Sequence, residues 1–137
     1  MNGNNSGQTL GNQETLENYV ADNSALENEL SVSTNHKFDN FTKSLNKDKQ
    51  GKHIPSHKNY KPGKSFLTIS MNEVQSFVNT YSGKGNPIGN NKERVDFGKV
   101  IGKYIDPDTG KSYDTTIGII HYSKTGTHIV PARPKEN

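Results

Sequence analysis

Residues 121–130, near the C-terminal end, concentrate groups that can move protons. The segment holds His121 and His128, two of the chain's five histidines, together with Ser123, Lys124 and Thr127. Cleavage of RNA by its own 2′-hydroxyl needs a base, an acid and a cation for the charged phosphorane, without a metal ion. Histidine suits both proton roles because its unperturbed pKa lies near 6.5. These residue types are therefore sufficient for metal-independent ribonuclease chemistry.

A lysine-rich stretch supplies further candidates. It contains His53 and Tyr60 and carries the lysines Lys43, Lys47, Lys49, Lys52, Lys58, Lys61 and Lys64. We expect His53 to be a third proton-transfer candidate, and we expect phosphate to be bound by Lys64, Lys124 or Arg133. Tyr60 and Tyr122 are candidates for stacking on bases. The plainer alternative is a solvated linker, with His36 and His57 as solvated loop residues.

The register of the terminal hairpin decides which groups meet. Gly126 supplies the positive φ that a tight turn requires. A two-residue loop, Thr125-Gly126, would place Ser123 opposite His128. A three-residue loop beginning at Lys124 would pair Tyr122 with His128 instead. Either register clusters proton-transfer groups on one sheet surface.

Metal and cofactor sites find little support in the sequence. Cysteine is absent, which excludes thiol catalysis and cysteine-ligated metal centres. His53 and His57 have a zinc-like spacing, but Pro55 between them breaks helical geometry. Gly83-Lys84-Gly85 follows a predicted helix instead of preceding one, so it does not fit a phosphate-binding loop. We expect neither a metal ion nor a cofactor.

Composition divides the chain into a polar leader and a folded domain. Apolar residues make up only 28% of the 137 residues, and the mean hydropathy is −0.95. They become denser from Phe66 onward, so we expect the core in the C-terminal half. We divide the chain into a polar, partly helical segment (1–46) and a C-terminal domain (47–137). No apolar run approaches membrane-spanning length, and the N-terminus lacks a signal-peptide core.

Local patterns predict an α+β fold. Helical spacing of apolar residues occurs over Glu14–Leu30 and His36–Leu45. Ser70 and Glu73 form a capping box that begins a helix ending near Tyr81. Alternating residues predict long strands over Glu93–Ile105 and Lys111–Ser123, and Thr127–Pro131 completes the hairpin. The elements indicate a helix on a curved antiparallel sheet of at least three strands.

Several segments together resemble one toxin family. They are Lys49-Gln-Gly-Lys-His53-Ile-Pro-Ser-His57-Lys-Asn-Tyr60, Gly63-Lys-Ser-Phe-Leu-Thr-Ile-Ser70, Val95-Asp-Phe-Gly-Lys-Val-Ile-Gly102 and His121-Tyr-Ser-Lys-Thr-Gly-Thr-His-Ile-Val-Pro-Ala-Arg133. In order and spacing, residues 47–134 resemble the polymorphic toxin type 50 domain, a group of ribonucleases from bacterial toxin systems. The resemblance implies the fold shared by barnase, EndoU, colicin nucleases and RelE, with N-terminal helices and a curved sheet of three to five strands.

The family motif, carried over, implies a site made of His53, His121, Ser123, Lys124, Thr127, His128 and Arg133. His53 and either His121 or His128 would form the acid–base pair, and Lys124 or Lys64 would stabilise the phosphorane. Upstream, Glu17-Asn18-Tyr19 resembles the junction before the toxin tip of contact-dependent inhibition proteins. This implies delivery as part of a larger effector and action in the cytoplasm of a target cell.

Three functions compete on these observations. The first is an RNA endonuclease toxin acting on tRNA or other RNA and neutralised by a cognate, acidic immunity protein; a host activator stays open. The second is a nucleic-acid-binding module without catalysis, associated with phage or secreted proteins. The third is an ADP-ribosyltransferase, which ranks last because Glu136 lies beyond any predicted strand.

Overall fold

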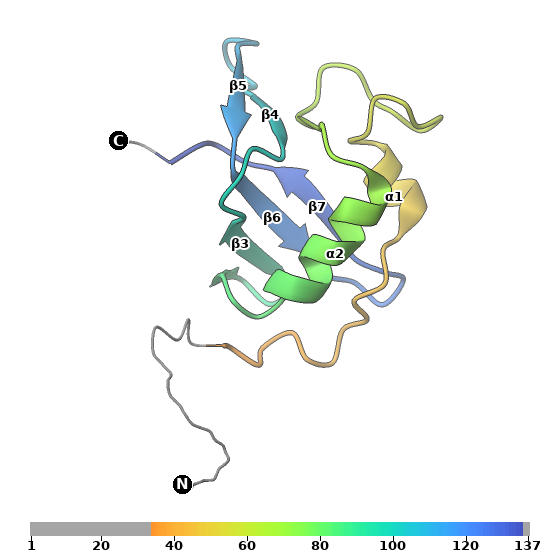
Figure 1. The fold of residues 1–137 in the computed structure, drawn as a ribbon, viewed down its shortest axis with the longest axis vertical. Helices are drawn as coiled ribbons and strands as arrows, with labels where there is room; N and C mark the ends of the chain where they lie inside the picture. The colour runs from red at the N-terminus through yellow and green to blue at the C-terminus, as the bar shows by residue number, and fades with distance from the viewer. Residues whose placement is uncertain (1–33, 136–137) are drawn as a thin grey trace, which may run out of the picture. The chain divides into compact units, whose positions relative to one another are not determined.

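Two antiparallel sheets and two helices make up the part of the chain that the computed structural model describes, residues 34–135 (Figure 1). The elements in chain order are α1 (Lys47–Gly51), β1 (Phe66–Leu67), α2 (Met71–Tyr81), β2 (Asn86–Ile88), β3 (Lys92–Asp96), β4 (Gly102–Ile105), β5 (Ser112–Thr115), β6 (Ile117–His121) and β7 (His128–Pro131). The smaller sheet has the strand order β1-β4-β5, and the larger has β2-β3-β6-β7. The predicted α+β class is confirmed.

Helix α2 begins at the capping box that the sequence predicts. The Ser70 hydroxyl accepts a hydrogen bond from the Glu73 amide at 3.1 Å, and the Glu73 carboxylate accepts one from the Ser70 amide at 3.3 Å. Both bonds satisfy amides that the first helical turn leaves without a partner. Val74 and Val78 are buried on one face of the helix, which lies across β7 (Figure 1).

Helix α1 lies within a stretch for which the sequence shows no periodicity. It spans one turn, too short to show a repeat, and its start is marked by an N-cap. The Asn46 side chain accepts from the Lys49 amide at 3.1 Å. This short helix carries the lysine-rich segment onto β7, and His53 follows it directly.

Each of the two long predicted strands is divided in the structure. The first becomes β3 and β4, and the second becomes β5 and β6, so each crosses from one sheet to the other. The Phe97 amide donates to Thr116 O and the Ile101 amide donates to Thr115 O, both at 2.9 Å, so residues 98–100 loop out between these bonds. Extra residues on one strand bend a ribbon, which explains how one hairpin supplies both sheets.

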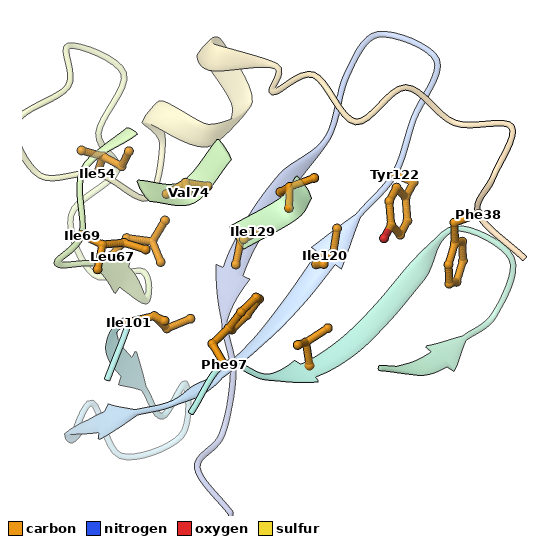
Figure 2. Packing of buried hydrophobic residues seen from close by; sticks show 12 residues of the cluster. Phe38, Ile54, Leu67, Ile69, Val74, Phe97, Ile101, Ile120, Tyr122 and Ile129 are labelled. Atoms are coloured by element: carbon orange, nitrogen blue, oxygen red, sulfur yellow. The ribbon is translucent and has the colours of Figure 1, made fainter. Parts of the chain in front are cut away.

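The hydrophobic core lies between α2 and the larger sheet and extends to β1 (Figure 2). Figure 2 shows Ile120 and Ile129 at its middle, with Leu67 towards one end and Tyr122 facing Phe38 at the other. The rings of Phe38 and Tyr122 stack with centroids 4.5 Å apart. The core therefore includes a residue from well before α1.

The segment before α1 differs from its prediction. Residues 36–45 form turns in place of the predicted helix, which was wrong, although Phe38 is buried and Phe41 and Leu45 pack against the core. The spacing of the apolar residues therefore predicted correctly that they are at least partly buried, but not the backbone structure that buries them. The predicted helix Glu14–Leu30 lies outside the described residues, and the division at residue 46 stays a prediction. Neither helix described within residues 34–135 is long and apolar enough to cross a membrane.

Candidate active site

Three histidine rings stack at one edge of the larger sheet. His121 on β6 lies directly opposite His128 on β7, and their ring centroids are 4.7 Å apart at an interplanar angle of 20°. His53 lies 6.3 Å from His128, with an interplanar angle of 10°. Three histidines separated by up to 75 positions (128 − 53) in the chain are therefore brought together, and His128 is stacked with each of the other two rings.

Both predicted registers of the terminal hairpin are wrong, because the ladder ends at the His121–His128 pair. The Tyr122 amide instead donates to Asn91 O at 2.8 Å, and the Thr127 amide donates to Ser44 O at 2.9 Å. Neighbouring segments thus take the backbone bonds that a tighter hairpin would have used. Gly126 has the expected positive φ, at 127°.

His53 is held in one tautomer by its surroundings. Its Nδ1 lies 2.8 Å from Ser65 O, a backbone carbonyl that can only accept. Nδ1 therefore carries the proton in the neutral ring, and Nε2 is left with a lone pair that can accept one. The backbone is fixed as well, because the Leu67 amide donates to His53 O at 2.7 Å. This arrangement suits a general base.

Gln50 fastens α1 to the strand that carries His128. Its side-chain Nε2 donates to Ile129 O at 2.9 Å, and its Oε1 accepts from the Ile129 amide at 2.7 Å. The fully buried amide thus pairs with β7 as another strand would. Because His53 lies one turn after Gln50, this pair sets its distance from His128. Nothing in the sequence marks Gln50 as a site residue, because a buried glutamine has no distinctive local pattern.

Burial and positive charge lower the pKa of all three imidazoles. Burial is the largest cause, lowering the pKa of His128 to about 3 and that of His121 to about 4; the pKa of His53 is also lowered. The charged neighbours that add to this effect are Lys49 and Lys52 at His128, Lys92 at His121, and Lys64 and Lys52 at His53. An anion bound beside these neutral imidazoles would be attracted by the lysines and would raise the pKa of each ring.

A groove of about 450 Å³ opens beside His53. Its wall is formed by His53, Gly63, Lys64, Ser65, Tyr104, Ile105, Pro107, Val130 and Pro131. Lys64, selected from the sequence as a phosphate ligand, therefore lies at the edge of the same site as His53. Among residues 34–135, no group of histidine or acidic side chains is arranged to hold a metal ion.

The turn after β6 uses its hydroxyl groups internally. The Ser123 hydroxyl donates to Gly126 O at 2.7 Å, and Lys124 is exposed at the tip of the turn. Thr127 is fully buried, and its hydroxyl donates to Thr42 O at 2.7 Å. The hydroxyls of Ser123 and Thr127 thus hold the turn in place, whereas Lys124 stays accessible.

Tyr122, a predicted base-stacking residue, lies in the core. Only 1% of its surface is exposed, and its hydroxyl donates to Glu93 Oε1 at 2.7 Å. Burial and this carboxylate raise the pKa of the phenol. The ring stacks on Phe38 and Phe41 and so is not available to a base, which corrects the expectation from the sequence. Strand alternation places it on the face opposite to His121.

The remaining candidates lie around the groove. Tyr60 is half-buried, with its ring edge-on to Phe66. Arg133 lies over the ring of Tyr104, with the guanidinium carbon 5.3 Å from the centroid, and pairs with Asp106 at 3.6 Å. The chain therefore brings Tyr60 and Arg133 to the neighbourhood of β1 and β4, and not onto the histidine stack itself.

The family comparison covers most of this arrangement. The model of the bacterial toxin 50 family matches residues 45–131. The chain belongs to the bacterial toxin 50 family. The matched region contains α1, Gln50, all three stacked histidines and the groove-lining residues, so in this bacterial toxin 50 domain the site and the family signature coincide. A search of curated proteins found no match.

The toxin 50 domain also holds lysines that the sequence analysis did not assign to the histidines. Lys49 and Lys52 belong to the noted lysine-rich stretch, but nothing in their spacing shows that they face His128. Lys92 comes from β3 and reaches His121 through the sheet, since the two residues are paired in register. Only strand pairing could have revealed Lys92.

Proposed function

We propose that this toxin domain is a metal-independent RNA endonuclease. The observation that carries the proposal is the stack of His53, His128 and His121 among lysines, next to an open groove. An acid, a base and cations are the groups that 2′-hydroxyl attack on a phosphodiester requires. Membership in a bacterial toxin family supports the same reading, because destruction of RNA kills a cell.

In the proposed reaction His53 is the base. Its Nε2 takes the proton of the 2′-hydroxyl while the 2′-oxygen attacks phosphorus. The bond from phosphorus to the 5′-oxygen breaks, and His128 gives its proton to that oxygen, leaving a 2′,3′-cyclic phosphate and a 5′-hydroxyl. His128 is assigned over His121 because it is the ring next to His53. His121 stacks on His128 and orients it.

Lysines supply the charge in this scheme. The charge of Lys52 lowers the pKa of both His53 and His128, while Lys64 acts on His53 and Lys49 on His128. Ammonium groups beside a partly dehydrated phosphate stabilise the extra negative charge of the phosphorane. The phosphate in turn raises the pKa of His128, which enables that ring to hold the proton it must donate. Lys124, exposed on the turn, would contact the RNA backbone.

The experiment incubates the purified chain with total bacterial RNA in EDTA. The variants are His53→Ala and His128→Ala, with His36→Ala as the matched control, because His36 is exposed and pairs with Asp39 away from the site. We expect fragments ending in 2′,3′-cyclic phosphate, a loss of about 100-fold or more in both site variants, and none in the control. Intact RNA that still binds to the folded wild type would overturn cleavage in favour of the non-catalytic nucleic-acid-binding alternative.

The wider context of the proposal is a delivered toxin. We propose tRNA as the target in the cytoplasm of a competing cell, delivery as the tip of a contact-dependent inhibition protein, and neutralisation by an acidic immunity protein. Support for the partner comes from the lysines around the histidines, since opposite charge speeds and orients association. Sequencing of the fragments from the same reaction identifies the target, and fragments that map away from tRNA would overturn that part.

A further inference from the structure

The groove beside His53 is lined by two chemically different kinds of residue. Lys64 carries a positive charge and His53 an imidazole, and both suit an anion. Tyr104, Ile105, Pro107, Val130 and Pro131 supply an aromatic ring and apolar surface. A volume of about 450 Å³ lies within the range of small-ligand sites, about 300–1,000 Å³. A positive charge and an aromatic ring in the same groove match the two parts of a nucleotide.

The ring of Tyr104 is fixed in place without a ligand. The Arg133 guanidinium lies over it at 5.3 Å and donates to its hydroxyl oxygen at 3.3 Å. Asp106 pairs with Arg133, and Asp106 is itself anchored by the amide of Asp108 at 2.8 Å. A ring ordered in advance loses little conformational freedom when a ligand stacks on it.

Strand geometry connects the groove to the histidines. His128 and Val130 are two residues apart on β7, so their side chains share one face, about 7 Å apart along the strand. The half-buried ring of His128 therefore lies on the same strand face as Val130, which lines the groove, and His53 is itself part of the groove wall. A phosphate at the histidines leaves its attached nucleoside within reach of Tyr104.

We propose that the groove binds the nucleotide adjoining the cleaved phosphate, with its base against Tyr104 and its phosphate between Lys64 and His53. The inference rests on the proposed RNA cleavage for its biological meaning, but the binding itself is independent of catalysis. It makes Tyr104 a substrate-binding residue and the groove the place where base preference is set. Because every base has an apolar face, the ring adds affinity for all four and the groove wall distinguishes them.

The test is a set of NMR titrations of the full chain with inorganic phosphate and with adenosine and uridine 3′-monophosphates. Phosphate should perturb the imidazole signals of wild type and Tyr104→Ala alike. The nucleotides should bind wild type about tenfold more tightly than phosphate does, and Tyr104→Ala should lose that increment. Tyr104→Phe, which keeps the ring, should retain most of it.

Tyr113→Ala is the matched control. Tyr113 lies opposite Tyr104 on β5, is exposed, and does not line the groove. Its removal should leave nucleotide affinity unchanged. Nucleotides that bind no tighter than phosphate, or an equal loss in both tyrosine variants, would overturn the groove assignment even if RNA is cut. Ring-dependent nucleotide binding without RNA cleavage would overturn the proposed reaction and keep the groove.

Discussion

Two polar clusters occupy opposite faces of β6, and they differ in what their atoms are bonded to. On one face, Glu93 is fully buried and its carboxylate accepts from the amides of Gly83 and Gly85 and from the Tyr122 hydroxyl. On the other, His121 and His128 are half-buried, and no hydrogen bond involves either ring among the described residues.

The difference distinguishes a structural cluster from a reactive one. A buried carboxylate is tolerated when donors replace its water, and the Glu93 cluster does this completely. In the histidine stack the pKa of each ring is lowered, and within residues 34–135 the ring nitrogens of His121 and His128 have no hydrogen-bond partner, an arrangement typical of groups that bind a ligand. Adjacent residues, His121 and Tyr122, thus belong to opposite kinds of cluster.

The largest effect on stability should come from Glu93→Ala. It would leave the buried amide of Gly83 and the partly buried amide of Gly85 without their acceptor, and the Tyr122 hydroxyl with Ser82 Oγ as its remaining partner, at a cost of about 1–3 kcal/mol for an unsatisfied group. We expect the free energy of unfolding in urea to fall by about 3 kcal/mol or more. Tyr122→Phe, which removes a single donor, should cost less than half of that. Equal stability of Glu93→Ala and wild type would remove the distinction between the clusters.

Gln50→Leu should affect both function and stability, because Gln50 connects α1 to β7. Its loss leaves the amide and carbonyl of Ile129 unpaired in the core, costing about 2 kcal/mol. Since α1 carries His53, we expect kcat for RNA cleavage to fall about tenfold with a small change in KM. Gln75→Leu is the control, because its side chain also makes two bonds to backbone, donating to Lys43 O and accepting from the Leu45 amide, but in the segment before α1 and not to β7. A change in KM alone would contradict a positioning role.

The pH dependence of cleavage should show the smallest and most specific effect. The profile of kcat/KM reports the pKa values of the free enzyme, and those of the histidines are lowered. The proposed acid, His128, must carry a proton to react. Its deprotonation should therefore lower kcat/KM at a pH below about 6.5, the usual pKa of histidine. The phosphate of a bound substrate raises these pKa values. The alkaline limb of the pH profile, where activity falls as the acid loses its proton, should therefore lie at higher pH for kcat than for kcat/KM.

Lysine variants sharpen this prediction. Lys52→Gln removes a positive charge that faces both His53 and His128, so the limb of kcat/KM should move to higher pH. Lys58→Gln removes an exposed charge from the same segment that acts on neither ring, and should leave the limb unmoved. Identical shifts in the two variants would attribute the effect to net charge alone.

Sequence signals predict the local structure correctly where that structure depends only on neighbouring residues in the chain. The capping box at Ser70 and the turn glycine at Gly126 both occur in the structure as predicted. The predictions were wrong for segments whose structure depends on contacts with distant residues. Residues 36–45 form turns and irregular chain in place of the predicted helix, because Phe38 packs on Tyr122. The hairpin register differs from both predictions because the Thr127 amide donates to Ser44 O.

The residue types, the family and the selection of the three histidines follow from the amino-acid sequence, since they depend only on residue identity and spacing. Stacking of the histidines, the effect of lysines from α1 and β3 on their pKa, and burial of Tyr122 in the core arise only when the chain folds. Gln50 shows the physical reason. Its bonds to Ile129 join residues 79 positions apart, and side-chain identity alone does not encode which distant backbone atoms a buried amide will meet.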